Sequence, residues 1–222
     1  MARDLAHPDL VVAVFGAGTM GRGIAQVCAQ AGLTTLLFDS RAGAVQEAIA
    51  VIDKGIEGLV SKGRMTPDAK QSVIDHLRPI GSLDEAATAG LVIEAIVEHL
   101  DAKRELFREL EKRLAPDAVL ATNTSSLSVT EIAAGCAIPA RVVGLHFFNP
   151  PPVMKLVEVI GGLPTDPALV EALVGFARRI AKYPVIATDT PGFVVNHAGR
   201  AYGPEALRIV AQGIATPREA GA

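Results

Sequence analysis

The stretch LVVAVFGAGTMG, residues 10–21, decides the fold of this chain. It opens with six consecutive apolar residues, which is typical of a strand buried on both faces of a parallel sheet. The segment Gly16–Gly21 matches the pattern GxGxxG and leads into helical periodicity over Met20–Gln30. A buried strand, a glycine-rich turn and a helix in this order predict the start of a dinucleotide-binding α/β domain.

The three glycines of this turn have separate physical roles. Gly16 permits the tight turn, Gly18 lets a pyrophosphate approach the backbone, and Gly21 allows the helix to pack closely on the strand. The start of the helix supplies free amides and the positive end of its dipole. A glycine-rich turn without a ligand is the alternative, and the strand–turn–helix context argues against it.

Asp39 lies 18 residues after Gly21, at the end of a second expected strand, Thr34–Phe38. A carboxylate at this place accepts hydrogen bonds from ribose hydroxyls and repels a 2′-phosphate, so NAD is favoured over NADP. Arg41 is close enough in sequence to leave NADP open. The predicted cofactor-binding residues of this region are Gly16, Ala17, Gly18, Thr19, Met20, Gly21 and Asp39.

Further short apolar runs alternate with helical patterns, at residues 90–94, 118–122 and 141–145. This alternation predicts βαβ units and therefore an α/β fold with a parallel sheet of the Rossmann type.

Residues 42–78 interrupt the alternation with two helical patterns, which are split by Gly63 and by the helix-start pair Thr66-Pro67. We expect a helical hairpin inserted between the second and third strands. Its polar Lys54 and Lys62 could contact a large anionic ligand, or could simply belong to a solvated helix face.

A Pro-rich segment, FFNPPP at residues 147–152, separates the strand that ends near His146 from the apolar run Val153–Ile160. A short turn between two strands implies antiparallel pairing, so the sheet should be mixed at one edge. His146 and Glu158 each lie six residues from Pro152, which places them opposite each other with Cβ atoms roughly 5 Å apart.

A carboxylate at that distance can orient the imidazole of His146 and stabilise its protonated form. Such a base suits removal of a hydroxyl proton while hydride leaves the same carbon. Taken alone, a histidine at a strand end is more often structural than catalytic, so the structural interpretation stays open.

Polar residues also follow the expected strand 118–122, in the segment Asn123–Ser126. Ligands of parallel α/β sheets bind beyond the carboxyl ends of the strands. Ser125 could therefore contact a substrate oxygen, or could cap the next helix. Glu98 and Lys103, at the start of the helix after strand 90–94, are solvated helix residues on composition alone.

The composition limits the partners of the chain. It has 222 residues, 50% of them hydrophobic, and a net charge of −3 without a long run of Lys or Arg, so neither nucleic acid nor a membrane is expected as a partner. No apolar stretch is long enough to span a bilayer, and the opening residues lack a secretory or transit pattern. Cys28 and Cys136 show no metal or disulfide spacing and should be small buried residues. We expect a soluble, cytoplasmic protein with no metal site.

Five motifs together identify a family. They are GAGTMGRGIAQ (16–26), EAIVEHLDAKRELFREL (94–110), TNTSSLSVTEIA (122–133), GLHFFNPPPVMKLVEVI (144–160) and DTPGFVVN (189–196). In this collinear order, from Leu10 to Asn196, the chain resembles the 3-hydroxyacyl-CoA dehydrogenases of the short-chain, 3-hydroxybutyryl-CoA type. The resemblance implies NAD-dependent oxidation of (S)-3-hydroxyacyl-CoA to 3-oxoacyl-CoA in fatty-acid or aromatic-acid catabolism.

The resemblance also assigns roles to individual residues. His146 matches the catalytic base, Glu158 the carboxylate that orients it, Ser125 the serine that contacts the substrate carbonyl, and Asn196 an asparagine that completes the site. Glu98 and Lys103 match contacts to the nicotinamide-ribose side of the cofactor. Asn123 and Asn149 match polar residues near the same pocket, and Ser125 is shared between the cofactor and the substrate. The helical hairpin corresponds to the part that receives CoA, where Lys54 and Lys62 are candidate contacts.

The chain departs from the family at its end. A helical pattern runs from Gly192 to about Gly213, Pro204 interrupts it, and its apolar Ile209, Val210 and Ile214 would need a partner. The resemblance implies an NAD-binding domain over residues 1–190 and, over 191–222, only the first helix of an all-helical C-terminal domain. The chain is then either a fragment or a short member of the family, and this helix could mediate a homo-oligomer.

Two other functions remain open. The chain could be an NAD-binding fragment or module without turnover of its own. It could also oxidise a different hydroxy acid on the same scaffold.

Overall fold

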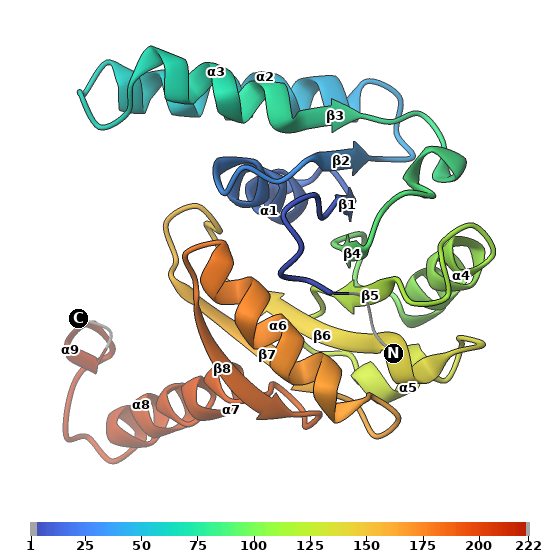
Figure 1. Cartoon of the computed structure of the whole chain (residues 1–222). Coiled ribbons are helices and arrows are strands. Elements are labelled where there is room, and N and C mark those ends of the chain that lie inside the picture. The colour runs from blue at the N-terminus through green and yellow to red at the C-terminus, as the bar shows by residue number, and fades with distance from the viewer. Residues whose placement is uncertain (1–3, 221–222) are drawn as a thin grey trace.

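The computed structural model describes residues 4–220 as an eight-stranded sheet with helices on both faces (Figure 1). The strand order is β3-β2-β1-β4-β5-β6-β7-β8. The strands are β1 (Val12–Phe15), β2 (Thr35–Phe38), β3 (Leu77–Pro79), β4 (Leu91–Glu94), β5 (Val119–Thr122), β6 (Val142–Phe147), β7 (Leu156–Gly161) and β8 (Tyr183–Thr188). The α-helices are α1 (Thr19–Gln30), α2 (Ala44–Val60), α3 (Pro67–His76), α4 (Leu100–Glu111), α5 (Val129–Ala133), α6 (Pro167–Arg179), α7 (Val195–Gly199), α8 (Tyr202–Ala211) and α9 (Pro217–Ala220).

The central strands are buried because helices cover both faces of the sheet. Val12 and Val14 of β1 face the apolar side chains of α1, α2 and α6, whereas Ala13 and Phe15 face those of α4 and α5. All four side chains are fully buried. This two-sided burial explains why the strand is a continuous apolar run rather than an alternating one.

The predicted change of direction at one edge is confirmed. Strands β1 to β6 pair in parallel, β6 and β7 pair antiparallel, and β8 returns parallel to β7. In the antiparallel pair His146 lies opposite Glu158, as the equal spacing from Pro152 predicts. The mixed edge therefore joins the two residues that the catalytic hypothesis needs.

The predicted hairpin consists of α2 and α3, which lie along the β3 edge of the sheet at the top of Figure 1. Thr66 caps α3 by accepting a hydrogen bond from the amide of Ala69, and Pro67 occupies the first turn. Lys70 joins the two helices through ion pairs with Asp53 and Glu57. The hairpin is thus held by its own cap and charge pairs as well as by its apolar side.

Two of the boundaries that differ from the prediction have a clear physical cause. Strand β3 falls at the end of the segment predicted to be helical, because the three residues LRP are too short and too polar to show a strand pattern. Strand β7 begins at Leu156 rather than at Val153, because the amides of Val153 and Met154 both bond the carbonyl of Pro150 in a turn.

The interruption expected in the C-terminal helical pattern is present, because the pattern is divided into α7 and α8. The ring of Pro204 would clash with the carbonyl of Arg200, four residues earlier, so one continuous helix cannot pass this point. Pro204 instead lies in the first turn of α8, where a missing N–H is tolerated.

Of the apolar side chains predicted to need a partner, Ile214 is exposed, whereas Ile209 and Val210 are half-buried; Leu207, which the pattern did not single out, is exposed as well. The exposed fractions are 73% for Leu207 and 70% for Ile214. In Figure 1, α8 and α9 extend away from the sheet. Within residues 4–220, no helix combines the length and the apolar character needed to cross a bilayer.

The two cysteines are free thiols, and they differ in burial. Cys28 is fully buried on α1, and this burial raises its pKa to about 12, so it behaves as a small apolar residue. Cys136 is only half-buried, so the prediction of full burial holds for Cys28 alone.

Gly144 and Gly175 offer a matched test of the packing. A Cβ on Gly144 would lie 2.9 Å from side-chain carbons of both Ile160 and Val129, whereas a Cβ on Gly175 of α6 would meet nothing within 4 Å. We expect Gly144→Ala to lower the free energy of unfolding by about 1–3 kcal/mol through overpacking. Gly175→Ala should raise it by about 0.5–1 kcal/mol through helix propensity. Urea denaturation of both variants checks this, and equal effects would contradict the packing described at Gly144.

Candidate functional site

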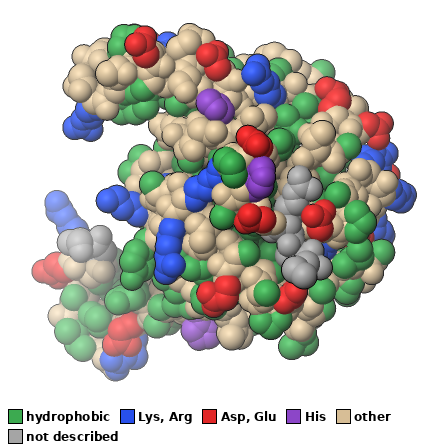
Figure 2. Space-filling model, in the orientation of Figure 1, with side chains coloured by type: hydrophobic (Ala, Val, Ile, Leu, Met, Phe, Trp, Pro, Cys, Tyr) green, Lys and Arg blue, Asp and Glu red, His purple; other side chains and the backbone are tan. Residues whose placement is uncertain are grey.

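The predicted site residues meet where the loops after β1, β4, β5 and β6 come together. A cavity of about 320 Å³ lies there. Its lining residues are Met20, Ala95, Ile96, Glu98, Lys103, Asn123, Ser125, His146, Phe147, Phe148 and Asn149. Figure 2 shows that the molecule is hollowed between the hairpin and the C-terminal helices, with Lys and Arg side chains around the hollow.

The glycine-rich turn adopts the geometry that its sequence predicts. Gly16 has φ 101°, and a Cβ there would lie 2.5 Å from the carbonyl oxygen of Ala95. A Cβ on Gly21 would lie only 1.7 Å from the carbonyl oxygen of Gly16, which excludes any side chain. A Cβ on Gly18 would meet no protein atom within 4 Å, so its open side is free for a ligand. The turn therefore leaves a clear approach to the start of α1, where a pyrophosphate binds well.

Asp39 is tied to this turn. Its two carboxylate oxygens accept hydrogen bonds from the amides of Ala17 (2.7 Å) and Arg41 (2.8 Å). A second cavity, of about 460 Å³, is lined by Asp39 and by Gly16 and Gly18, and it has the size of a nucleoside site. The Arg41 guanidinium is engaged by both carboxylate oxygens of Glu47, at 3.1 and 2.6 Å. Arg41, the basic residue that would favour NADP, is thus paired with Glu47.

His146 and Glu158 form a buried pair. The Nδ1 atom of His146 lies 2.7 Å from Oε2 of Glu158, and both side chains are nearly inaccessible. The other oxygen, Oε1, accepts hydrogen bonds from the amides of Val194 and Val195, each at 2.9 Å. A carboxylate that accepts on both oxygens places the imidazole proton on Nδ1, which leaves Nε2 as the basic nitrogen.

Two aromatic rings enclose the imidazole. The ring centroids of Phe148 and Phe193 lie 4.5 and 5.7 Å from that of His146. Neither ring was among the predicted site residues, because an aromatic residue beside a strand suggests only core packing. Their contact with His146 depends on the antiparallel turn and on the segment that follows β8.

Ser125 does not cap a helix. Helix α5 begins at Val129, and its cap is Ser128, which accepts a hydrogen bond from the amide of Glu131. The capping interpretation of Ser125 is therefore wrong. Ser125 lies in the loop after β5 and lines the cavity.

Glu98 organises that loop through direct hydrogen bonds. Its Oε1 atom accepts hydrogen bonds from the Thr124 hydroxyl (2.6 Å) and from the amide of Ser125 (2.9 Å). Burial raises the pKa of Glu98, but the hydrogen bonds from Thr124 and Ser125 and the nearby Lys103 ammonium outweigh it, so its pKa is lowered overall. Glu98 is thus held as a carboxylate at the rim of the cavity.

Lys103 is not a solvated helix residue, because only 1% of its side chain is exposed. Its ammonium lies 2.5 Å from Oε1 of Glu94 and 3.3 Å from Oε2 of Glu98. Glu94 is itself fully buried and accepts hydrogen bonds from the Thr122 hydroxyl and the amide of Ile96. Sequence analysis missed Glu94, although an acidic residue that ends an apolar strand at the ligand-binding edge was an available sign.

The three asparagines occupy different places around the cavity. Asn123 accepts a hydrogen bond from the amide of Phe147 (2.9 Å) and so joins the ends of β5 and β6. Asn196 donates to the carbonyl of Ser125 at 3.4 Å, and Asn149 lines the cavity with an exposed side chain. All three asparagines therefore lie near Ser125 and His146, where the family resemblance places them.

Lys54 and Lys62 are exposed on and after α2, and neither is among the described residues that line the 320 Å³ cavity. Their position leaves them free to meet the far end of a long ligand.

Asp189 fixes the DTPGF motif. It accepts hydrogen bonds from the Ser128 hydroxyl (2.7 Å) and from the amides of Val129 and Thr130 (2.9 and 2.8 Å) at the start of α5. Burial raises the pKa of Asp189, but these hydrogen bonds outweigh it and lower the pKa overall. The motif is thereby anchored beside the loop that carries Ser125.

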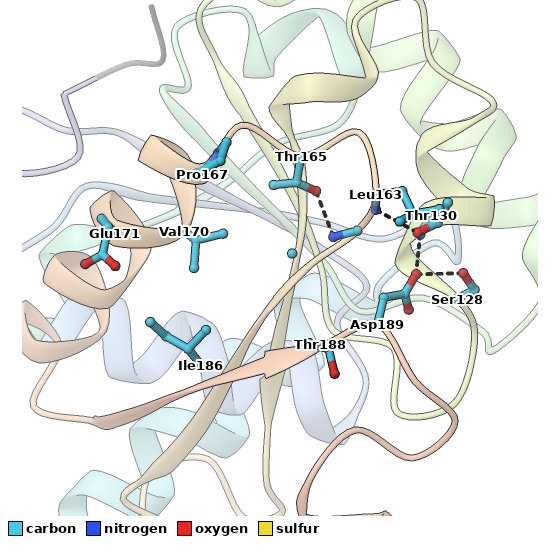
Figure 3. Close-up of a pocket in the computed structure, with 12 residues that line it drawn as sticks. Ser128, Thr130, Leu163, Thr165, Pro167, Val170, Glu171, Ile186, Thr188 and Asp189 are labelled. Carbon is cyan, nitrogen blue, oxygen red and sulfur yellow. Dashed lines mark hydrogen bonds between the residues drawn. The ribbon is translucent and has the colours of Figure 1, made fainter.

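A larger cavity, of about 760 Å³, lies between α6, β8 and the start of α5, where Asp189 bonds Ser128 and Thr165 bonds the backbone (Figure 3). His146 is not among its described lining residues, and the side chains of Ser128, Thr130, Thr165 and Asp189 are hydrogen-bonded to one another or to the neighbouring loops. Across the described part of the chain, no cluster of three His, Cys, Asp or Glu side chains is arranged to hold a metal ion.

Comparison with known proteins agrees with this geometry. The family model described as 3-hydroxyacyl-CoA dehydrogenase, NAD binding domain, matches residues 11–190. A 3-hydroxyadipyl-CoA dehydrogenase of Escherichia coli (strain K12) is 45% identical over 206 residues, which are 93% of this chain and 43% of that protein. A 3-hydroxybutyryl-CoA dehydrogenase of Clostridioides difficile is 39% identical over 94% of this chain and 74% of its own length.

Solved structures give the same answer. The crystal structure of 3-hydroxybutyryl-CoA dehydrogenase from Escherichia coli K12 superposes with a TM-score of 0.92 at 44% identity, and the match covers 94% of this chain and 44% of that one. This chain therefore spans less than half the length of the Escherichia coli relatives that it matches. From its motifs, its fold and the match over residues 11–190, the chain belongs to the 3-hydroxyacyl-CoA dehydrogenase family, and this region is its NAD-binding domain.

Proposed function

We propose that this chain carries the cofactor site and the catalytic dyad of an enzyme that oxidises (S)-3-hydroxyacyl-CoA to 3-oxoacyl-CoA. The observation that carries the proposal is the His146–Glu158 pair, which opens onto a cavity beside the glycine-rich turn. The relatives' names support a CoA-thioester substrate and a role in catabolism of fatty or dicarboxylic acids.

The geometry suits proton transfer from the substrate. Nε2 of His146 takes the proton of the 3-hydroxyl group, and Glu158 offsets the charge of the resulting imidazolium. Bound NAD supplies the acceptor for the hydride that leaves C3. Because the oxidation releases one proton, the reverse reduction is favoured as the pH falls.

The remaining side chains position the reactants. Ser125 donates to the substrate carbonyl and Asn196 completes the oxygen contacts. Glu98 and Lys103 face the nicotinamide-ribose side of the cofactor. The hairpin receives the CoA moiety, where Lys54 and Lys62 are candidate partners of its phosphates. In this scheme residues 1–190 form the NAD-binding domain, and 191–222 begin a helical domain through which copies could associate.

A second function has one observation in its favour. The exposed apolar side chains of α8 favour an NAD-binding unit that needs further structure for turnover. A different hydroxy acid as substrate is the third candidate. Competition by free CoA for substrate binding separates it from the first.

The first prediction concerns turnover and its base. We expect NADH formation when the chain is mixed with NAD and (S)-3-hydroxybutyryl-CoA, measured by absorbance. His146→Gln should lower kcat on the order of 10²–10⁴-fold, because it removes the base, while NADH affinity stays unchanged. The control is His76→Gln on the hairpin. Full turnover of His146→Gln would refute the base assignment, and NADH binding without turnover by the unaltered chain would favour the NAD-binding unit.

The second prediction concerns the tautomer of His146. In Glu158→Gln, the amide oxygen can still accept from Val194 and Val195, so the amide NH₂ group faces His146. Nδ1 must then accept and the proton moves to Nε2, which abolishes its basicity. We expect kcat to fall on the order of 10³–10⁴-fold with KM little changed. The kcat of the double variant Glu158→Gln/His146→Gln should be no lower than that of the slower single variant. Additive losses in kcat would show that the two residues act separately.

The third prediction concerns cofactor choice. Asp39→Asn removes the charge that repels a 2′-phosphate while keeping the side-chain size. We expect the ratio of the NADPH Kd to the NADH Kd to fall at least about tenfold, measured by fluorescence titration. Asp68→Asn, on the exposed start of α3, serves as the control. An unchanged ratio for Asp39→Asn would mean that discrimination lies elsewhere.

A further inference from the structure

Lys182 holds the turn between β6 and β7. Its ammonium donates hydrogen bonds to the backbone carbonyls of Pro151 (2.5 Å) and Met154 (2.8 Å). Both acceptors belong to the turn that follows Phe148 and Asn149, which line the site cavity. Hydrogen bonds from an ammonium are stronger than those between neutral groups, so this one side chain restrains both halves of the turn.

The end of α6 aims Lys182 at this turn. Ala181 adopts the left-handed conformation, with φ 57°, and the amide of Lys182 bonds back to the carbonyl of Ala177 at 2.9 Å. This arrangement ends the helix and fixes the direction of the next residues. The amide of Tyr183 then bonds the carbonyl of Lys155 at 2.7 Å, which starts the pairing of β8 with β7. Lys182 is therefore fixed by backbone contacts on both sides.

A second contact also holds the turn. Pro151 is buried against α1, where a Cβ on Gly23 would lie only 2.8 Å from the Pro151 ring. Helix α1 begins at the cofactor turn. The turn thus lies between the helix that carries the cofactor loop and the strand that leads to the DTPGF motif. Partial burial lowers the pKa of Lys182, which agrees with an ammonium lodged between these elements.

We propose that Lys182 is a positioning residue for the acyl-CoA subsite. By holding the carbonyls of Pro151 and Met154, it keeps Phe148 packed on His146, at 4.5 Å between ring centroids, and keeps Asn149 at the cavity wall. The assignment of the subsite to acyl-CoA rests on the proposed function. The clamp on the turn is a property of the chain itself.

Arg179 provides a matched control. It lies at the end of the same helix and also donates to backbone carbonyls, those of Leu5, His7 and Pro8. It therefore has the same chemistry but restrains the N-terminal segment instead of the turn. Arg179→Met should cost stability in a similar way without reaching the site cavity.

The test compares Lys182→Met, Lys182→Arg and Arg179→Met in the full chain. Hydrogen exchange followed by mass spectrometry reports the protection of residues 147–155, where the amides of Val153 and Met154 bond Pro150. We expect exchange in this segment to accelerate roughly tenfold in Lys182→Met, because the turn loses both hydrogen bonds that the Lys182 ammonium donates to it. Lys182→Arg should restore most of the protection, and Arg179→Met should change exchange only near the N-terminus.

Kinetics then separate positioning from stability. In Lys182→Met the KM for (S)-3-hydroxybutyryl-CoA should rise roughly tenfold, while kcat and NADH affinity stay close to those of the unaltered chain. Unchanged exchange over 147–155, an equal effect of Arg179→Met on that segment, or faster exchange with an unchanged KM would each overturn the proposal. If the unaltered chain binds NADH but shows no turnover, the proposed function fails. The acyl-CoA assignment of the subsite then fails with it, and the exchange comparison still decides whether Lys182 clamps the turn.

Discussion

The buried carboxylate of Glu158 is the constraint on which the site depends. A fully buried carboxylate is tolerated only when its oxygens are satisfied. One oxygen meets His146 across the antiparallel strands, and the other accepts the amides of Val194 and Val195. The same group therefore sets the tautomer of the base and draws the segment with Asn196 toward the cavity. The antiparallel pairing of β6 and β7 is what brings His146 and Glu158 together.

A second set of charges organises the opposite wall. Glu94 and Glu98 share the Lys103 ammonium, while Glu94 also accepts a hydrogen bond from Thr122 at the end of β5 and Glu98 accepts one from the Ser125 amide. Removing one member would leave a buried charge without its partner, which is costly in a protein interior. The ends of β4 and β5 and the start of α4 are thus joined by one network. Ser125 is held both by this network and by hydrogen bonds within its own loop, where the Thr124 hydroxyl accepts from the amides of Ser126 and Leu127.

Several features could be read from local patterns. The turn after β1 requires glycine at positions 16 and 21 because a Cβ at either position would clash with backbone atoms. The GxGxxG pattern makes this requirement recognisable in the sequence. The pairing of His146 with Glu158 follows from counting residues about a short turn, because an antiparallel register is fixed by turn length. By contrast, the strand Leu77–Pro79 has no pattern of its own and forms only because β2 offers it an edge.

The sequence by itself determined the α/β class, the glycine-rich cofactor turn, and the opposition of His146 and Glu158, because these depend on periodicity and spacing along the chain. Only the tertiary structure decided that Lys103 is buried, that Ser128 rather than Ser125 caps α5, and that Lys182 reaches the turn after β6. The physical reason is that burial and long-range hydrogen bonds depend on which elements pack together. A charged residue at a helix start has the same local sequence whether its neighbour is water or a buried glutamate.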